Sequence, residues 1–228
     1  MQRLDDQGTL FRPAPSAIVS DTRVVAVLRA SHASEYAPVM EALQLGGVLS
    51  IELTLSTPGV WDELPRLQER FGGAVEIGVG TVTSAAEAET ALDLGAAYIV
   101  TPITDLGVIN ACVSRGVAVY PGGLTPTELH AGWKLGATAV KVFPASTVGA
   151  GYISQLRGPF PDIQVIPSGG VGIDDIPAWI RAGALAVSLG GPLLGDAFKG
   201  GDLQELTARA CRVRDLIDRT ANQVGATR

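Results

Sequence analysis

The sequence predicts an α/β protein that folds as a (β/α)8 TIM barrel with a short N-terminal helix. Short apolar segments occur eight times along the 228 residues, and amphipathic segments alternate with them. In five places an amphipathic segment ends at a glycine that leads directly into an apolar segment. An open, doubly wound sheet is the alternative, but no G-x-G-x-x-G follows the first strand, which disfavours it.

The chain is expected to form one domain, because a composition of 46% hydrophobic and 18% charged residues suits one large core. Residues 1–23 are expected to be an N-terminal arm, loose to about residue 16, that ends in a short helix near Ala17 to Thr22. Residues 24–228 are expected to be the barrel. Glycine and proline are spread between the apolar runs, which indicates many tight turns rather than a linker.

The predicted strands are runs of apolar and β-branched residues bounded by glycine, proline or polar residues. In chain order they are Val24 to Arg29, Ser50 to Leu55, Val75 to Thr81, Tyr98 to Pro102, Val117 to Pro121, Ala139 to Pro144, Gln164 to Ser168 and Ala186 to Gly190. Helices are predicted where amphipathic segments open with polar residues and end at glycine, as at Ala33 to Leu45, Ser84 to Leu94, Thr125 to Leu135 and Ile173 to Ala182. A last helix, roughly Asp202 to Arg219, is expected to cover the barrel wall.

The joints from helix to strand repeat one pattern. They read L-G-G at 45–47, L-G-A at 94–96, R-G-V at 115–117, L-G-A at 135–137 and A-G-A at 182–184. Glycine just past a helix end supplies the left-handed residue that turns the chain back. The sequence therefore contains the same αβ joint five times.

Composition and charge exclude several classes of partner. A net charge of −6 and the absence of a basic block argue against a nucleic-acid surface. No apolar run approaches the roughly 20 residues of a membrane helix, and the first residues lack the apolar segment of a signal peptide. Cys112 and Cys211 suit a reducing compartment, so a cytoplasmic protein is expected. His32 and His130 have no metal-ligand spacing, which argues against a divalent-metal site.

Lys141 is the residue that suggests a chemistry. Of the three lysines in the chain, Lys134 lies in a helix-like turn and Lys199 beside two glycines, whereas Lys141 lies inside the predicted strand A-V-K-V-F-P. Alternation along that strand puts Val140 and Val142 on one face and Lys141 on the other. Burial favours the uncharged form of an amine, and an uncharged lysine is the nucleophile of Schiff-base enzymes.

Glu52 is expected to share the barrel interior with Lys141. In S-I-E-L-T-L, Glu52 and Thr54 face the barrel axis, while Ile51 and Leu53 face the helices. Catalysis is one interpretation. The other is a buried Glu52–Lys141 ion pair that only holds the barrel together, which is the weaker one because buried pairs contribute little stability compared with apolar packing.

Other polar residues stand at the C-terminal ends of predicted strands, where barrel active sites form. Arg29 could hold a carboxylate through two hydrogen bonds, and Thr81 could add a hydroxyl donor. A strand-end salt bridge and a capping threonine are the alternatives. The glycine-rich turns S-G-G-V-G at 168–172 and G-G-P at 190–192 could present N–H groups to a phosphate or be tight turns only.

Several motifs are distinctive together and run in register from about Val24 to Gly191. They are I-E-L-T-L around Glu52, G-V-G-T-V-T around Thr81, I-V-T-P ending at Pro102, Y-P-G at 120–122, T-P-T-E-L at 125–129, V-K-V-F-P around Lys141, R-G-P-F-P at 157–161 and S-G-G-V at 168–171. In these motifs the chain resembles the 2-keto-3-deoxy-6-phosphogluconate (KDPG) aldolase and 4-hydroxy-2-oxoglutarate (KHG) aldolase family.

The resemblance implies a metal-independent class I aldolase without a cofactor, usually a homotrimer. Such an enzyme cleaves KDPG or 4-hydroxy-2-oxoglutarate to pyruvate plus glyceraldehyde 3-phosphate or glyoxylate. The resemblance implies that Lys141 forms the Schiff base and that Glu52 is the general acid/base. The implied substrate-binding residues are Arg29, Thr81, Pro102, Phe143, Ser168, Gly169, Gly170 and Gly191.

The chain departs from the family pattern at two positions. Ser56 stands where other members carry arginine, and Arg29 matches a branch of the family that brings this arginine from the first strand. Pro192 stands where many members carry a serine that contacts the substrate phosphate, and proline offers neither a hydroxyl nor an N–H. An unphosphorylated or shorter 2-keto acid is therefore a competing substrate.

Two other functions are compatible with parts of this pattern. A phosphate-binding barrel isomerase or synthase would use the Gly169-Gly170 turn without a covalent adduct. A trimeric barrel that has lost catalysis would serve as a binding module, although the retention of both Glu52 and Lys141 argues against it.

Overall fold

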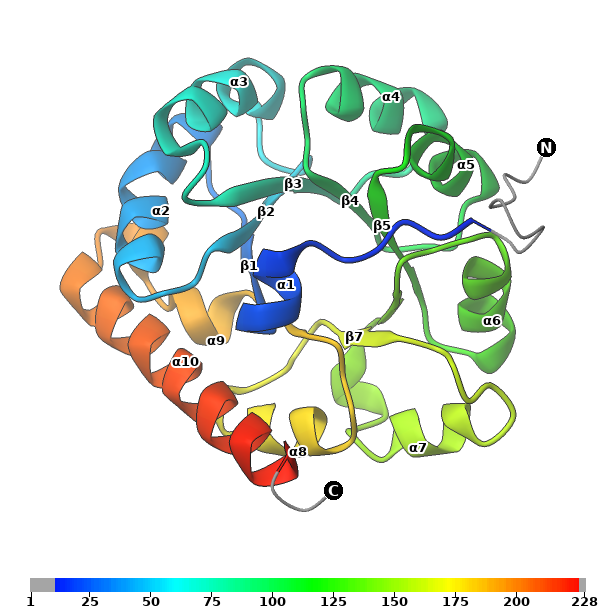
Figure 1. Ribbon diagram of the computed structural model, residues 1–228. Helices are drawn as coiled ribbons and strands as arrows, with labels where there is room; N and C mark the ends of the chain where they lie inside the picture. The colour runs from blue at the N-terminus through cyan, green and yellow to red at the C-terminus, as the bar shows by residue number, and fades with distance from the viewer. Residues whose placement is uncertain (1–10, 226–228) are drawn as a thin grey trace.

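Eight parallel strands form a nearly closed barrel in the computed structural model of the chain, which describes residues 11–225 (Figure 1). The predicted fold class is confirmed. The strands are β1 (Val24–Leu28), β2 (Ser50–Thr54), β3 (Glu76–Gly80), β4 (Tyr98–Thr101), β5 (Ala118–Gly123), β6 (Val140–Val142), β7 (Val165–Pro167) and β8 (Val187–Leu189). The first ten residues of the expected arm lie outside the described residues.

The strand order closes the barrel. Neighbours follow the order β7-β6-β5-β4-β3-β2-β1-β8, and β1 pairs with both β2 and β8. The remaining seam, between β7 and β8, is bridged at Ser168 and Ser188, whose hydroxyls lie 3.3 Å apart. The consecutive strand order and the bridge between β7 and β8 together exclude the open, doubly wound sheet.

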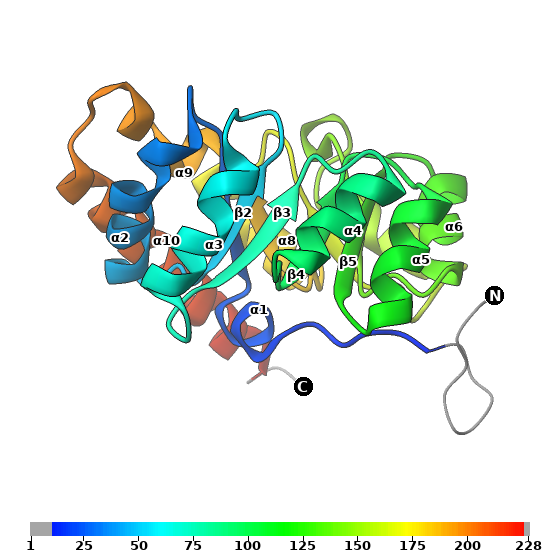
Figure 2. The ribbon, with the colours of Figure 1, turned by 90° about the horizontal axis from the view of Figure 1, so that it is seen from above.

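Helices follow the strands and surround the barrel (Figures 1 and 2). They are α1 (Ala17–Thr22), α2 (Tyr36–Leu45), α3 (Val60–Phe71), α4 (Ala85–Asp93), α5 (Leu106–Arg115), α6 (Pro126–Lys134), α7 (Tyr152–Arg157), α8 (Ile176–Arg181), α9 (Gly191–Leu194) and α10 (Leu203–Gly225). Short 3₁₀ turns are η1 (Ala33–Glu35), η2 (Ala145–Thr147), η3 (Ile173–Asp175) and η4 (Ala197–Lys199). Because α1 leads directly into β1, it lies at the end of the barrel where the strands begin (Figure 2).

The apolar side chains form two layers, as the alternation along the strands predicts. Ile51 and Leu53 belong to the layer between the strands and the helices. A smaller cluster that includes Tyr98, Tyr120 and Ile166 fills the barrel interior, where the two tyrosine rings meet edge to face at 5.6 Å. These side chains fill most of the interior near the start of the strands, where a small cavity of about 180 Å³ remains beside Tyr98 and Tyr120, and the larger cavity lies at the other end of the barrel.

The predicted αβ joints are present at all five places. Gly47, Gly95, Gly116, Gly136 and Gly183 have φ between 72° and 97°. In the first joint the left-handed residue is the second glycine of the pair, since Gly46 has a φ of −83°. Each joint closes its helix and starts the next strand without the cost that a Cβ would add.

The element bounds differ modestly from the predicted ones. Most strands lose a residue or more at their ends, and β6 keeps only Val140–Val142. The Phe143 N–H still donates to the backbone oxygen of Gly123 in β5 at 3.0 Å, and Pro144, which has no N–H, cannot continue the ladder. β5 runs two residues past the predicted end at Pro121, and α10 runs to Gly225 rather than to Arg219. Among the described residues, no helix combines the length and apolarity needed to cross a membrane. The division of the chain into an N-terminal arm of residues 1–23 and a barrel domain of residues 24–228 stays a prediction.

Candidate active site

A cavity of about 580 Å³ opens at the C-terminal ends of the strands, and its size is typical of small-molecule sites. It is lined by every residue that the sequence predicted for a site: Arg29, Glu52, Thr81, Pro102, Lys141, Phe143, Ser168, Gly169, Gly170 and Gly191. Because parallel strands all end at the same rim of a barrel, residues far apart in sequence meet there.

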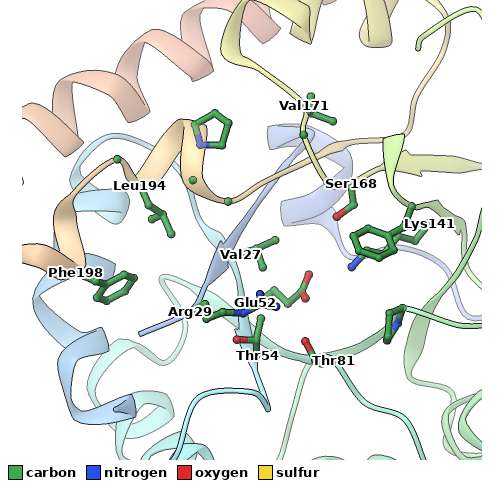
Figure 3. A pocket seen from close by; sticks show the side chains of 18 of the residues that line it. Val27, Arg29, Glu52, Thr54, Thr81, Lys141, Ser168, Val171, Leu194 and Phe198 are labelled. Atoms are coloured by element: carbon green, nitrogen blue, oxygen red, sulfur yellow. The ribbon is translucent and has the colours of Figure 1, made fainter. Parts of the chain in front are cut away.

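Lys141 and Glu52 project into this cavity from the middle of two strands. Lys141 is the central residue of β6, and Glu52 is the central residue of β2. Figure 3 shows the amino group of Lys141 and the carboxylate of Glu52 pointing into the same space from opposite sides. Their side chains therefore face the barrel axis, as predicted.

Both groups are buried and neither is in a close ion pair. Lys141 is 7% exposed and Glu52 is 1% exposed. Among residues 11–225, no ion pair within 4.0 Å joins them to each other or to another charge. The nearest aromatic contact of the Lys141 Nζ is the Phe143 ring, 5.2 Å from its centroid. Burying two polar groups without a close partner costs stability, so a stabilising ion pair does not account for Lys141 and Glu52.

Gly80 makes the room that Glu52 occupies, and the sequence did not identify it as a site residue. A Cβ at position 80 would lie 1.9 Å from Oε1 of Glu52 and 2.4 Å from its carboxyl carbon. The glycine belongs to the G-V-G-T motif, which drew attention only to Thr81. The cross-strand pairing of Thr54 with Gly80 explains the closeness, because that register sets β2 beside β3.

Thr81 has a backbone conformation that is unusual for a residue with a side chain. Its φ is 61°, in the left-handed region, and it follows directly on β3 at the cavity wall. Such conformations cost about 1–3 kcal/mol and concentrate at functional sites. The hydroxyl of Thr81 faces the cavity (Figure 3), where it is placed to donate to a bound anion.

Arg29 enters the cavity from the end of β1, whereas Ser56 does not line it. The Ser56 hydroxyl donates to Oγ1 of Thr54 at 3.2 Å. Arg29 is exposed and forms no ion pair with any described residue. Its guanidinium is thus available to a carboxylate of the substrate.

The turn after β7 is built for close approach of a ligand to the backbone. Gly169 and Gly170 have φ of 83° and 75°. A Cβ at Gly169 would lie 2.9 Å from the Phe143 ring, and one at Gly170 would lie 2.6 Å from Cβ of Ser146. Within the described residues, the N–H groups of Gly169, Gly170 and Val171 donate to no protein acceptor. Successive free N–H groups of this kind bind anions.

Five further residues line the cavity that sequence reasoning did not place there: Val27, Leu194, Gly195, Phe198 and Lys199. Val27 alternates with Leu28 on β1, so its inward orientation could have been read from the strand. Phe198 and Lys199 lie in η4, beyond the last strand, and no local sequence signal marks them as site residues.

The two histidines have structural neighbours outside the cavity. His32 accepts a hydrogen bond from the backbone N–H of Ser34 at the start of η1, and His130 stacks on Phe160 at 4.0 Å. Within residues 11–225, His, Cys, Asp and Glu do not gather in groups of three or more.

Comparison with known proteins gives consistent matches. The family profile described as KDPG and KHG aldolase matches residues 16–209. A 2-dehydro-3-deoxy-6-phosphogalactonate aldolase of Escherichia coli is 32% identical over 82% of this chain and 89% of its own length. A 2-dehydro-3-deoxy-phosphogluconate aldolase of Pseudoalteromonas atlantica is 31% identical over 85% of this chain and 90% of its own. The solved structure described as native KDPGal superposes with a TM-score of 0.81, at 28% identity, over 87% of this chain and 96% of that one.

Proposed function

The chain belongs to the KDPG and KHG aldolase family, and from this premise we propose that it cleaves a 2-keto-4-hydroxy acid to pyruvate and an aldehyde through a Schiff base on Lys141. The main observation behind the proposal is that the side chains of Lys141 and Glu52 are both buried and both face one cavity without forming an ion pair. Candidate substrates are the 6-phosphorylated 2-keto-3-deoxy sugar acids named for the relatives and 4-hydroxy-2-oxoglutarate.

Lys141 acts as the nucleophile. Its free amine adds to the C2 ketone of the substrate, and the resulting carbinolamine loses water to give an iminium. Glu52 donates the proton that lets the hydroxyl leave as water. The iminium then withdraws electrons from the C3–C4 bond, which is the bond to be broken.

Glu52 serves a second time in the cleavage step. Its carboxylate takes the proton from the C4 hydroxyl as the C3–C4 bond breaks, so that C4 becomes the carbonyl of the departing aldehyde. The bonding electrons go to C3, where they form an enamine with the nitrogen of Lys141. Protonation at C3 and hydrolysis of the regenerated iminium release pyruvate and restore the free amine.

The remaining cavity residues hold the substrate in place. Arg29 and the hydroxyl of Thr81 bind the carboxylate next to the reacting ketone, which is supported by their position at the cavity wall and by the unpaired state of Arg29 among the described residues. Pro102 and Phe143 shape the pyruvyl pocket. Ser168, Gly169, Gly170 and Gly191 contact the aldehyde half of the substrate.

The assembly is proposed to be a cytoplasmic homotrimer. Membership of the family supports the trimer, and the free thiols of Cys112 and Cys211 support a reducing compartment. Ile103 and Leu106, which are 47% and 56% exposed, offer apolar surface for contacts between copies. Sedimentation should give three times the 23.5 kDa of one chain.

Borohydride trapping tests the proposal directly. Pyruvate and borohydride are added to the enzyme, and peptide mass mapping locates the reduced pyruvyl adduct, which we expect on Lys141. The adduct should disappear in Lys141→Arg, which keeps the charge but removes the nucleophile, and turnover of all 2-keto-4-hydroxy acids should disappear with it. Lys134→Arg on the outer helix α6 is the matched control and should keep both.

An adduct on another residue would reassign the nucleophile. The absence of any adduct in the folded wild-type protein would remove Lys141 as the nucleophile and overturn the Schiff-base proposal.

A further inference from the structure

A second cavity lies at the end of the barrel where the strands begin, away from the candidate active site. We infer that it binds a small primary alkylammonium ion, and that the carboxylate of Glu76 and the hydroxyl of Tyr120 hold the ammonium group. The inference does not depend on the aldolase chemistry, because the two cavities share no lining residue.

The second cavity is built from three neighbouring strands and the segment that precedes α1. Its volume is about 180 Å³, and it is lined by the first residues of β3, β4 and β5, which are Glu76, Tyr98 and Ala118. Ala14 and Ser16 form another part of its wall. Figure 1 shows the segment before α1 crossing the barrel, and Figure 2 shows it at the end where the strands begin. Residues far apart in the sequence therefore meet around one space.

Two buried oxygen atoms in this wall have no hydrogen-bond partner. Within residues 11–225, the buried side-chain nitrogen and oxygen atoms without a partner are Oε1 of Glu76 and the hydroxyl oxygen of Tyr120, and both residues line this cavity. Tyr120 is 2% exposed. The hydroxyl of Tyr98, by contrast, accepts a hydrogen bond from Ser50 at 3.1 Å. Buried polar atoms are nearly always hydrogen-bonded, so two exceptions in one cavity indicate a ligand that contacts both.

The charge of the wall decides the sign of this ligand. Glu76 is the one charged side chain that lines the cavity, and no described residue forms an ion pair with it within 4.0 Å. Burial, and after it the negative charge of Glu76, raises the pKa values of Tyr98 and Tyr120, which places the carboxylate near two neutral phenols. A carboxylate oxygen that is buried without a partner is unfavourable, and a ligand with a single positive charge would compensate it.

The chemistry of the wall favours an organic cation over a metal ion. Divalent metal ions are held by several carboxylate, carbonyl or imidazole groups, whereas Glu76 supplies the one carboxylate of this cavity. An ammonium group needs hydrogen-bond acceptors, which a carboxylate and a neutral phenol oxygen both provide. Small apolar residues offer surface to a short alkyl chain, and they are Ala14, Ala97, Val117 and Ala118.

The wall contributed by the N-terminal segment is held on both sides of the cavity. Before it, the guanidinium of Arg12 donates to the backbone oxygen of Trp133 at 3.0 Å and lies 3.3 Å from the centroid of the Trp133 ring. After it, the hydroxyl of Ser16 accepts a hydrogen bond from the backbone N–H of Val19 at 3.0 Å and caps α1. A cavity with ordered walls loses less entropy when it binds a ligand.

The first test compares a charged probe with an uncharged probe of the same length. Saturation-transfer NMR measures the binding of propylammonium chloride and of 1-propanol to the full chain, with sodium chloride added to equal ionic strength. Propylammonium should bind at least about tenfold more tightly than 1-propanol, because its hydrogen bonds to the carboxylate are charge-assisted. No binding of propylammonium, or equal binding of the two probes, would overturn the inference. Displacement of propylammonium by an equal concentration of potassium chloride would also overturn it.

Variants locate the binding site. Glu76→Gln removes the charge, and the Kd for propylammonium should rise about tenfold or more. Tyr120→Phe removes one acceptor but keeps the ring, and the Kd should rise about threefold. It tests the site independently if Glu76→Gln does not fold, and thermal melts report the folding of each variant.

Two other acids serve as matched controls. Glu69 is exposed on α3, and Glu52 is the buried acid of the other cavity. Glu69→Gln and Glu52→Gln should both bind propylammonium with the wild-type Kd. Wild-type binding in both Glu76→Gln and Tyr120→Phe would overturn the inference, and so would loss of binding in Glu52→Gln, which would place the ligand in the candidate active site.

Discussion

At the residue scale, the site depends on an absent side chain as much as on those present. Gly80→Ala should lower kcat by about 10²–10⁴-fold, the range of general acid/base catalysis. The reason is that the new Cβ would occupy the position of the Glu52 carboxylate, 1.9 Å from Oε1. Steady-state kinetics with the preferred 2-keto-4-hydroxy acid measures the effect, and the pyruvate adduct on Lys141 should form more slowly.

Gly151→Ala is the matched control for this glycine substitution. Gly151 lies at the start of α7 with an ordinary φ of −59°, and a Cβ there would meet nothing within 4 Å. It should keep wild-type kcat. A Gly80→Ala enzyme with full activity would show that Glu52 does not need its present position to act.

At the scale of elements, the left-handed glycine of each αβ joint is expected to contribute to the stability of the fold. Gly95 ends the helix α4 with a φ of 84°. Gly95→Ala should lower the free energy of unfolding by about 1–2 kcal/mol, because a Cβ in the left-handed region contacts the following carbonyl oxygen. Urea denaturation measures it, with kcat expected to stay near wild type. Gly151→Ala, at a φ that alanine adopts without strain, should not lower the midpoint, and equal midpoints for both variants would contradict the role assigned to the joint.

At the scale of the whole molecule, the packed interior predicts a loss of stability in alkali. Burial raises the pKa of the Cys112 thiol from 9.0 to about 12. Between these values the unfolded chain releases the proton while the folded chain keeps it, so stability falls as pH rises above 9. The contribution of Cys112 to this loss is about 1.4 kcal/mol at pH 10. Burial also raises the pKa values of Tyr98 and Tyr120, so these side chains add to the loss of stability in alkali.

Denaturation at pH 8 and pH 10 checks this prediction, with Cys112→Ala as the variant that should weaken the pH dependence. Thiol titration gives an independent reading: Cys211 is exposed and Cys112 buried, so one thiol should react in the native protein and two after unfolding. Rapid reaction of both thiols in the native state, or a stability that does not fall with pH, would contradict it.

The barrel and most of the residues that line the cavity could be predicted from local patterns in the sequence. The alternation of side chains along the strands predicted that Glu52 and Lys141 face the barrel axis, and the repeated glycine joints indicated a series of βα units. Such features depend on neighbours in the chain and on the fixed periodicity of a strand, so they can be read locally. The ten predicted site residues all reach one cavity because parallel strands of a barrel end at one rim.

The remaining features of the site depend on contacts between segments that are far apart in the sequence. The space beside Gly80 exists because β2 and β3 pair in one register, and Lys199 reaches the cavity because Phe198 docks on Tyr36, far away in sequence. These are contacts between distant segments, and their energy comes from packing and hydrogen bonds that form only after the barrel closes. A single short turn such as η4 has no sequence periodicity from which its packing position could be predicted. The unpaired state of Lys141 and Glu52 is likewise a property of the folded cavity, because it depends on which charges the other strands bring to it.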